Sequence, residues 1–311
     1  MKRIIFLVLV IFFKNTLLFA QEKIFISVFV NNQAITNVDI INEAKYLSAL
    51  NPKIKDLDKK KILKIAEESI IREKIKEDEL SKFINLEESS DLLNNIINDF
   101  YKRLQFNNLQ DFENYLKNFD LSLNEVIKKI KIEAKWNELI FAKYNNQVEI
   151  DIEKLKKKII EKNISDDENE IYFLNEIVFT VESKSTFKET YTKIIESINE
   201  IGFKNTANVY SVSDSARFGG EIGWVGKNKL NNRILEKLNT LKIGDVSKPI
   251  QVPGGYIILE MQDKKREKKK EKDLDQELNE LIMIEKNKKL NEFSIIHFNK
   301  TKVNSSIVYE N

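Results

Sequence analysis

The sequence predicts an α+β protein, in which a long and mostly helical region precedes a region with a small antiparallel sheet and helices. Two observations carry this prediction. Apolar residues recur at helical spacing through most of the first half of the chain. All eight glycines, by contrast, lie between Gly202 and Gly255. Because glycine adopts backbone shapes that other residues resist, most of the tight turns are expected in that second region.

Length and composition exclude several classes of protein. A chain of 311 residues suits about two domains. The 51 basic and 49 acidic residues leave a formal net charge of +2, which argues against a dedicated nucleic-acid binder. Because the chain has no cysteine and one histidine, disulfides, thiol chemistry and most metal sites are excluded. We expect no cofactor and no bound metal.

The first twenty residues have the layout of a secretory signal peptide. A basic start at Lys2 and Arg3 is followed by an apolar run over residues 4–13, and the small Ala20 precedes charged residues. The alternative is an uncleaved membrane anchor. Lys14 interrupts the apolar run, however, whereas a membrane-spanning helix needs about twenty apolar residues. We therefore expect export, with residues 1–20 as the signal peptide.

The mature chain is predicted to begin with a hairpin and a capped helix. Two apolar segments, Ile24–Val30 and Ala34–Ile35, flank an Asn-rich turn. Thr36 and Asp39 then have the spacing of a variant capping box, which opens a helix. This helix should end before Pro52, which cannot continue it.

More amphipathic helices follow, with charged residues on their outer faces. They are predicted over residues 58–83, 91–104, 109–119 and 123–144, the last capped by Ser122, and from Asp151 onward. The polar and acidic stretch Asn163–Glu170 is predicted to be a linker.

The glycine-containing region alternates strands and helices. We predict a strand over residues 171–179, a helix over 186–201, an extended segment over 210–213, a turn and strand edge over 219–224, a helix over 231–240, a further extended segment over 247–250 and a buried strand over 256–261.

This order of features resembles the parvulin family of peptidyl-prolyl isomerases, over roughly residues 170–263. The resemblance is carried by Tyr210-Ser211, Gly219-Gly220-Glu221-Ile222-Gly223-Trp224, Leu238, Leu241, Gly244, Pro249-Ile250 and Gly255-Tyr256-Ile257-Ile258. It implies a domain that assists rotation about the bond preceding proline, a reaction that requires no covalent intermediate and no cofactor.

The resemblance also implies where an isomerase site would lie. Parvulins have two histidines on central strands, and these positions are occupied here by Glu176 and Ile257. The nearby cysteine or aspartate position is Ser213, and the pair that grips the proline ring corresponds to Leu230 and Ile234. An apolar pocket could survive these changes, but the polar network cannot survive unchanged with an isoleucine in it. We therefore expect a degenerate isomerase site.

Other candidate residues each have an ordinary structural alternative. Tyr256 and Trp224 are candidate substrate-binding residues, although core packing is the commoner role for such aromatics. Glu176 and Asp214 could form an acid–base pair, although carboxylates on strands more often make ordinary hydrogen bonds. His297 lies outside the parvulin-like stretch, so a structural role is favoured over catalysis.

The remainder of the chain resembles the SurA type of periplasmic chaperone. The hairpin, the long helix that contains Ala66–Glu77, the further helices and the export signal occur in the same order. The resemblance implies a helical chaperone domain over residues 21–165, a parvulin-like domain over 170–263, and a helix and strand over 264–311 that pack back on the first domain.

Three expectations concern the end of the chain. The charge run Lys264–Lys272 is predicted to be a solvated helix or linker, with binding of phosphate or anionic lipid as the alternative. A helix should follow over residues 274–290. Phe293–Phe298 alternates like a final strand, which should lie near the strand of Ile24–Val30.

The expected function is that of a periplasmic chaperone that binds unfolded or nascent outer-membrane polypeptides. Its helical domain would supply the binding groove, and it would bind no nucleic acid and no small-molecule cofactor. Two alternatives remain open, an active prolyl isomerase and a foldase tethered to the membrane by an uncleaved leader.

Overall fold

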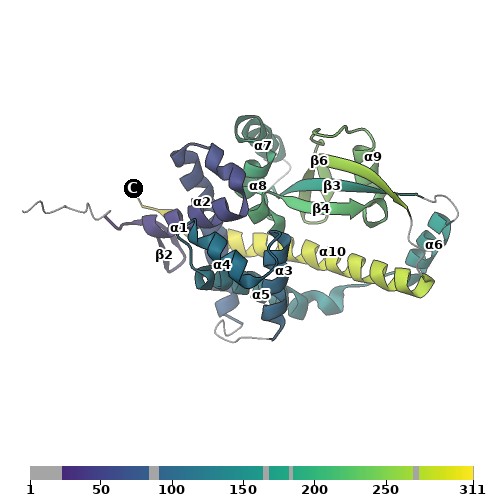
Figure 1. Cartoon of the computed structure of the whole chain (residues 1–311), viewed down its shortest axis with the longest axis horizontal. Helices are drawn as coiled ribbons and strands as arrows, with labels where there is room; N and C mark the ends of the chain where they lie inside the picture. Colours follow the sequence, from purple (N-terminus) through teal and green to yellow (C-terminus); the bar gives the residue numbers. More distant parts are fainter. Residues whose placement is uncertain (1–22, 84–90, 164–167, 182–184, 269–272, 311) are drawn as a thin grey trace, which may run out of the picture.

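The computed structural model describes residues 23–83, 91–163, 168–181, 185–268 and 273–310. It confirms the α+β class, because helices surround two separate antiparallel sheets (Figure 1). The three-stranded sheet has the order β2-β1-β7 and the four-stranded sheet the order β4-β3-β6-β5. The strands are β1 (Ile26–Val30), β2 (Gln33–Thr36), β3 (Glu168–Phe179), β4 (Glu221–Gly226), β5 (Ile250–Val252), β6 (Gly255–Lys268) and β7 (Ile307–Tyr309).

The helices of the first half begin and end close to the predicted residues. They are α1 (Asn37–Leu50), α2 (Lys59–Ser81), α3 (Asp91–Arg103), α4 (Leu109–Lys117), α5 (Leu123–Tyr144) and α6 (Ile152–Asn163). The capping box of α1 is formed as expected, since the backbone N–H of Asp39 donates to the Thr36 hydroxyl and the Asp39 carboxylate accepts from the Thr36 N–H. Ser122 and Glu125 cap α5 in the same way. Local sequence therefore determines where these helices start.

A 30-residue helix, α10 (Leu274–Val303), connects the two ends of the molecule. At about 1.5 Å per residue it is about 45 Å long. It runs beneath the four-stranded sheet from α6 to the helical region, where it packs on α5 and α2 (Figure 1). Beyond it, β7 pairs with β1 in antiparallel register, with Val28 opposite Tyr309. The end of the chain thus lies beside its beginning.

The prediction that Phe293–Phe298 forms the final strand is wrong, because these residues belong to α10. The alternation of apolar residues suggested a strand, but Ile295, Phe298 and Thr301 are also spaced for one face of a helix, and all three are buried. The strand that pairs with β1 is the shorter segment of residues 307–309.

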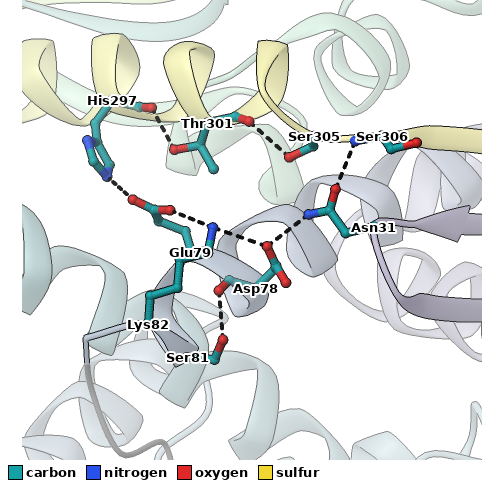
Figure 2. A network of polar contacts seen from close by, with 9 residues as sticks. All are labelled: Asn31, Asp78, Glu79, Ser81, Lys82, His297, Thr301, Ser305 and Ser306. Carbon is teal, nitrogen blue, oxygen red and sulfur yellow. Dashed lines mark hydrogen bonds and ion pairs between the residues drawn. The ribbon is translucent and has the colours of Figure 1, made fainter.

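A network of polar contacts fastens the end of α10 to α2 (Figure 2). His297 Nε2 lies 3.0 Å from Glu79 Oε1, and Lys82 lies 3.1 Å from the other Glu79 oxygen and 3.3 Å from Asp78. Asn31, in the turn between β1 and β2, donates to Asp78 and accepts from the backbone N–H just before β7. Three segments distant in sequence are therefore held at one point.

The charge run after residue 263 was also mispredicted. Lys264 to Lys268 continue β6, so they form neither a helix nor a linker, while residues 269–272 lie outside the described residues. These basic residues pair with the acidic start of β3, where Lys264 lies 3.2 Å from Glu170. Opposite charges across two strands stabilise this pairing.

The second half contains α7 (Phe187–Ile201), α8 (Phe203–Tyr210) and α9 (Asn232–Leu238). The structure differs from the prediction at α8, because Tyr210 ends this helix instead of starting an extended segment. Arg72 of α2 donates to the backbone oxygens of Asn208 and Val209 at 2.6 and 3.0 Å. Those carbonyls have no partner within their own helix. A contact with a distant helix therefore stabilises α8.

The predicted signal peptide, residues 1–20, lies outside the described residues. Within the part of the chain that the structure describes, no helix is long and apolar enough to cross a membrane.

Candidate functional site

The two faces of the four-stranded sheet separate the candidate site residues. Even-numbered residues of β3, including Leu174 and Val178, belong to an apolar cluster with Leu230 and Ile234. Odd-numbered residues such as Ile177 belong to a second cluster with α7 and α8. Because neighbouring strand residues point to opposite faces, Glu176 lies on the first face.

Glu176 is the centre of a polar cluster. Its Oε1 atom accepts hydrogen bonds from the hydroxyls of Ser213 at 2.6 Å and Ser215 at 2.9 Å. Ser213 directly precedes the short 3-10 helix η3 (Asp214–Phe218), and Ser215 lies within it. Burial raises the pKa of the Glu176 carboxyl above its ordinary value of 4.5, although the two serine hydrogen bonds act in the opposite direction.

The backbone at Gly220 holds this cluster in place. The Glu176 N–H donates to the Gly220 carbonyl at 2.7 Å. A Cβ atom at position 220 would lie 2.2 Å from the Glu176 carbonyl oxygen, and the φ angle there is +78°. Only glycine fits such a close approach at a positive φ. The Gly219-Gly220 pair of the sequence thus has a direct structural role beside Glu176.

A cavity of about 530 Å³ lies next to this cluster. Glu176, Ser213, Asp214, Ser215 and Ile222 line one side of it. The other side comes from the helical region and is lined by Arg103 of α3, Asn137, Ile140 and Phe141 of α5, and Asn287, Leu290, Asn291 and Ser294 of α10. Glu176, at the position of a parvulin histidine, therefore faces three helices that lie outside the parvulin-like stretch.

The predicted site residues are only partly brought together. Ser213 contacts Glu176 directly, whereas Leu230, Ile234 and Ile257 pack in the apolar cluster of the same sheet face. None of these three apolar residues is among those that line the cavity. The polar and apolar halves of the implied isomerase site are thus on one face, but only the polar half lines this cavity.

Tyr256 and Trp224 are placed on the opposite face. Tyr256 stacks on Phe179 at 5.5 Å between ring centroids, within the second apolar cluster. Trp224 is 39% exposed and packs edge-to-face on Phe173, at 5.4 Å. Both aromatics thus pack on neighbouring rings and lie on the face of the sheet opposite to Leu230 and Ile234.

The other two polar candidates have simple structural surroundings. His297 is 6% exposed and lies between Glu79 and the hydroxyl of Tyr144, which is 2.9 Å from Nδ1. Asp214 lies 3.4 Å from Lys76, and the hydrogen bonds of the Glu176 carboxylate go to serines instead of to Asp214. The structure does not pair Glu176 and Asp214 as an acid and a base.

An apolar groove of about 650 Å³ adjoins the cavity. Its apolar lining consists of Leu93, Ile96 and Phe100 of α3, Ile130, Ala134 and Phe141 of α5, and Phe218 of η3. The side chain of Phe141 is 48% exposed. The sequence predicted a binding groove in the helical domain and the amphipathic pattern of the two helices, but not which residues line this groove.

A buried ion-pair network lies below the groove. Glu133 of α5 accepts from Lys76 of α2 at 2.6 Å and from Arg217 of η3 at 2.8 Å. Burial would raise the pKa of Glu133, but attraction to Arg217 and Lys76 outweighs it and lowers that pKa to about 2. The ionised carboxylate thus joins two helices of the first half to the glycine-containing region.

The raised pKa of Glu176 leads to a prediction about stability. Below pH 4.5 both folded and unfolded chains carry the proton, whereas at higher pH the unfolded chain loses it first. Folding stability therefore falls as pH rises through the folded-state pKa. Glu176→Gln, which cannot ionise, should gain stability relative to wild type between pH 4 and pH 8, as measured by urea unfolding midpoints.

A second variant tests the same assignment. Ser215→Ala removes a hydrogen bond that favours the ionised carboxylate, so the loss of stability with rising pH should become larger. The assignment would be contradicted if the difference in urea unfolding midpoint between Glu176→Gln and wild type stayed constant from pH 4 to pH 8.

Comparisons with known proteins agree with this architecture. Residues 174–263 match the model of the PPIC-type peptidyl-prolyl isomerase domain. The chaperone SurA of Pseudomonas aeruginosa is 40% identical over 55 residues, which cover 18% of this chain and 13% of that protein. The foldase PrsA of Geobacillus kaustophilus is 34% identical over 89 residues, covering 28% of this chain and 31% of that protein. The chaperone SurA of Methylococcus capsulatus is 24% identical over 170 residues, covering 50% and 37%.

Matches to solved structures are weaker. A SurA-like chaperone of Campylobacter jejuni, from a study of PEB4 and Cj1289, is 19% identical, covering 92% of this chain and 99% of that one with a TM-score of 0.35. The chain matches 13% to 31% of the length of the first two curated relatives. The resemblance to a SurA-type chaperone with a parvulin domain is confirmed.

Proposed function

We propose that this chain, which contains a PPIC-type domain and is related to SurA-type chaperones, holds unfolded outer-membrane polypeptides in the periplasm. The observation that carries the proposal is the apolar groove between α3 and α5. Its volume of about 650 Å³ is that of a typical binding pocket for several side chains.

The composition of the groove suits a client that has not yet folded. Such a client exposes apolar and aromatic side chains, and burying them stabilises a complex by about 25 cal/mol per Å². Four of the groove residues are aromatic or long aliphatic side chains of α3 and η3, namely Leu93, Ile96, Phe100 and Phe218. A surface of this kind recognises apolar character more than a particular sequence, so selectivity should be broad.

The isomerase site is proposed to be degenerate. A catalyst of prolyl rotation must favour the twisted amide over the planar one, which needs polar groups around the bond. Ile257 supplies no such group, and it is buried among apolar neighbours. Glu176 supplies one, but the proposed proline-gripping residues Leu230 and Ile234 do not line the cavity beside it.

One observation favours a second candidate function, that of an active prolyl isomerase. The polar cluster of Glu176, Ser213 and Ser215 lies beside a cavity in which a peptide could be removed from water. Removal from water by itself can lower the barrier to amide rotation. An uncleaved leader would make such an isomerase a membrane-tethered foldase.

The division into domains is part of the proposal. A helical domain of residues 21–165 would hold the client, the parvulin-like domain of residues 170–263 would border the groove, and residues 264–311 would complete the first domain. The pairing of β7 with β1 supports the last of these assignments. Residues 1–20 would direct export, and the intact mass of the exported protein would reveal whether they are removed.

Two assays on the wild-type protein separate the candidates. A chaperone should suppress aggregation of an unfolded outer-membrane protein at equimolar amounts, and should leave the rate of a proline-limited refolding reaction unchanged. Acceleration of that refolding reaction, without any suppression of aggregation, would exclude the chaperone proposal and favour the isomerase.

A further inference from the structure

The apolar groove and the cavity beside Glu176 adjoin one another. They share four lining residues, Arg103 of α3, Asn137 and Phe141 of α5, and Asp214 of η3. An extended peptide advances about 3.3 Å per residue, so a segment that fills the groove has its next residues in the cavity. One extended segment of a client could therefore contact both the groove and the cavity.

Acidic and basic residues balance in the lining of the groove, four of each, whereas the cavity has one basic and two acidic lining residues. Its charged lining residues are Glu176, Asp214 and Arg103. Arg103 is already engaged, since it donates to the Glu221 carbonyl and its guanidinium lies 4.1 Å from the centre of the Phe218 ring. Asp214 lies 3.4 Å from Lys76. The acidic side of the cavity is thus only partly compensated.

Glu176 is attracted by Arg103, but not from ion-pair distance. Both of its hydrogen bonds come from serine hydroxyls and both go to Oε1. Among the described residues no Lys or Arg nitrogen forms an ion pair with it. A partly buried carboxylate that borders a cavity can accept a charge-assisted hydrogen bond from a ligand, and such bonds are about twice as strong as neutral ones.

We propose that Glu176 selects clients in which a basic side chain follows the apolar segment held between α3 and α5. The inference rests on the proposed chaperone function and names the client class of that site. The groove binds the apolar residues, while the adjoining Arg or Lys reaches the carboxylate of Glu176. Because burial raises the pKa of the Glu176 carboxyl and a bound cation favours its ionised form, affinity for the basic client should rise with pH.

The test uses three fluorescent peptides with the same apolar half, followed by arginine, glutamine or glutamate. Dissociation constants for the full-length protein are measured by fluorescence anisotropy. Wild type should bind the arginine peptide about tenfold more tightly than the glutamine peptide, as expected for one charge-assisted hydrogen bond. Glu176→Gln should remove this preference and still bind the apolar half.

Glu260→Gln is the matched control. Glu260 lies on β6 of the same sheet and is partly buried, with a hydrogen bond from Asn175, but it does not line the cavity. This variant should keep the preference for arginine. Thermal unfolding of both variants shows whether each remains folded.

The outcomes distinguish this inference from the proposed function. Equal binding of all three peptides by wild type, or a preference that persists in Glu176→Gln, overturns the role of Glu176 and leaves the groove intact. Failure of every peptide to bind refutes the groove itself. Tighter binding of the arginine peptide at pH 8 than at pH 6 in wild type, absent in Glu176→Gln, supports ionisation of the Glu176 carboxyl when the cation binds.

Discussion

Glu133→Gln should destabilise the protein by about 3–5 kcal/mol, because it removes the anion that two largely buried cations share and leaves Lys76 with only Asp214, at 3.4 Å. Glu133 is the shared partner of Lys76 and Arg217, whose side chains are 11% and 16% exposed. The loss is read from urea unfolding at pH 7, as a shift of the midpoint at constant slope.

The matched control for this variant is Glu138→Gln in the same helix. Glu138 pairs with Lys135 at 2.9 Å, but its side chain is 58% exposed, so the change should cost less than about 1 kcal/mol. Equal losses in the two variants would mean that the Glu133 network contributes no more than a surface ion pair.

The pH dependence of the network has a defined sign. Because the folded-state pKa of Glu133 is lowered to about 2, its contribution is present above the ordinary value of 4.5 and is lost as pH falls toward 2. The free energy of unfolding of wild type should therefore fall as pH falls from 4.5 toward 2. Glu133→Gln should show a smaller loss over the same pH range.

Ala134→Arg should abolish most of the chaperone activity with little loss of stability. Ala134 lines the apolar groove and is only partly buried, so a long charged side chain can occupy the groove without entering the core. Displacing one large apolar client side chain costs about 1.5–3 kcal/mol, which is a tenfold or greater loss of affinity. The measurements are suppression of aggregation and peptide binding by anisotropy.

Ala142→Arg provides the control, because Ala142 is an exposed residue of the same helix and does not line the groove. It should retain full activity. If Ala134→Arg suppresses aggregation as well as Ala142→Arg does, the client binds elsewhere on the molecule, and the groove between α3 and α5 loses its proposed role.

Several elements could be predicted from the sequence because their signals are local. The capping box at Thr36 and Asp39 determines where α1 starts, and the side chains of Ser122 and Glu125 do the same for α5. The parvulin-like strands followed from the positions of the glycines that flank them. Each of these features depends on residues close together in the chain.

Other elements depended on partners that sequence spacing does not reveal. Phe293–Phe298 fits a strand or a helix by pattern, and packing of its buried residues within α10 decides for the helix. α8 is short and is held by Arg72 and Asn51 from more than 130 residues earlier. Residues 264–268 extend β6 because the opposite strand begins with acidic residues.

The candidate site shows the same division. The sequence by itself determined which residue types occupy the parvulin positions, so Glu176, Ser213 and Ile257 could be named, and it determined the fold class through periodicity and glycine placement. Only the tertiary structure decided that Glu176 faces helices α3, α5 and α10 across a cavity, and that Trp224 and Tyr256 lie on the other face of the sheet. The physical reason is that side-chain chemistry and local backbone preference depend on a residue and its neighbours in the chain. A cavity, in contrast, exists only between surfaces that long-range packing brings together.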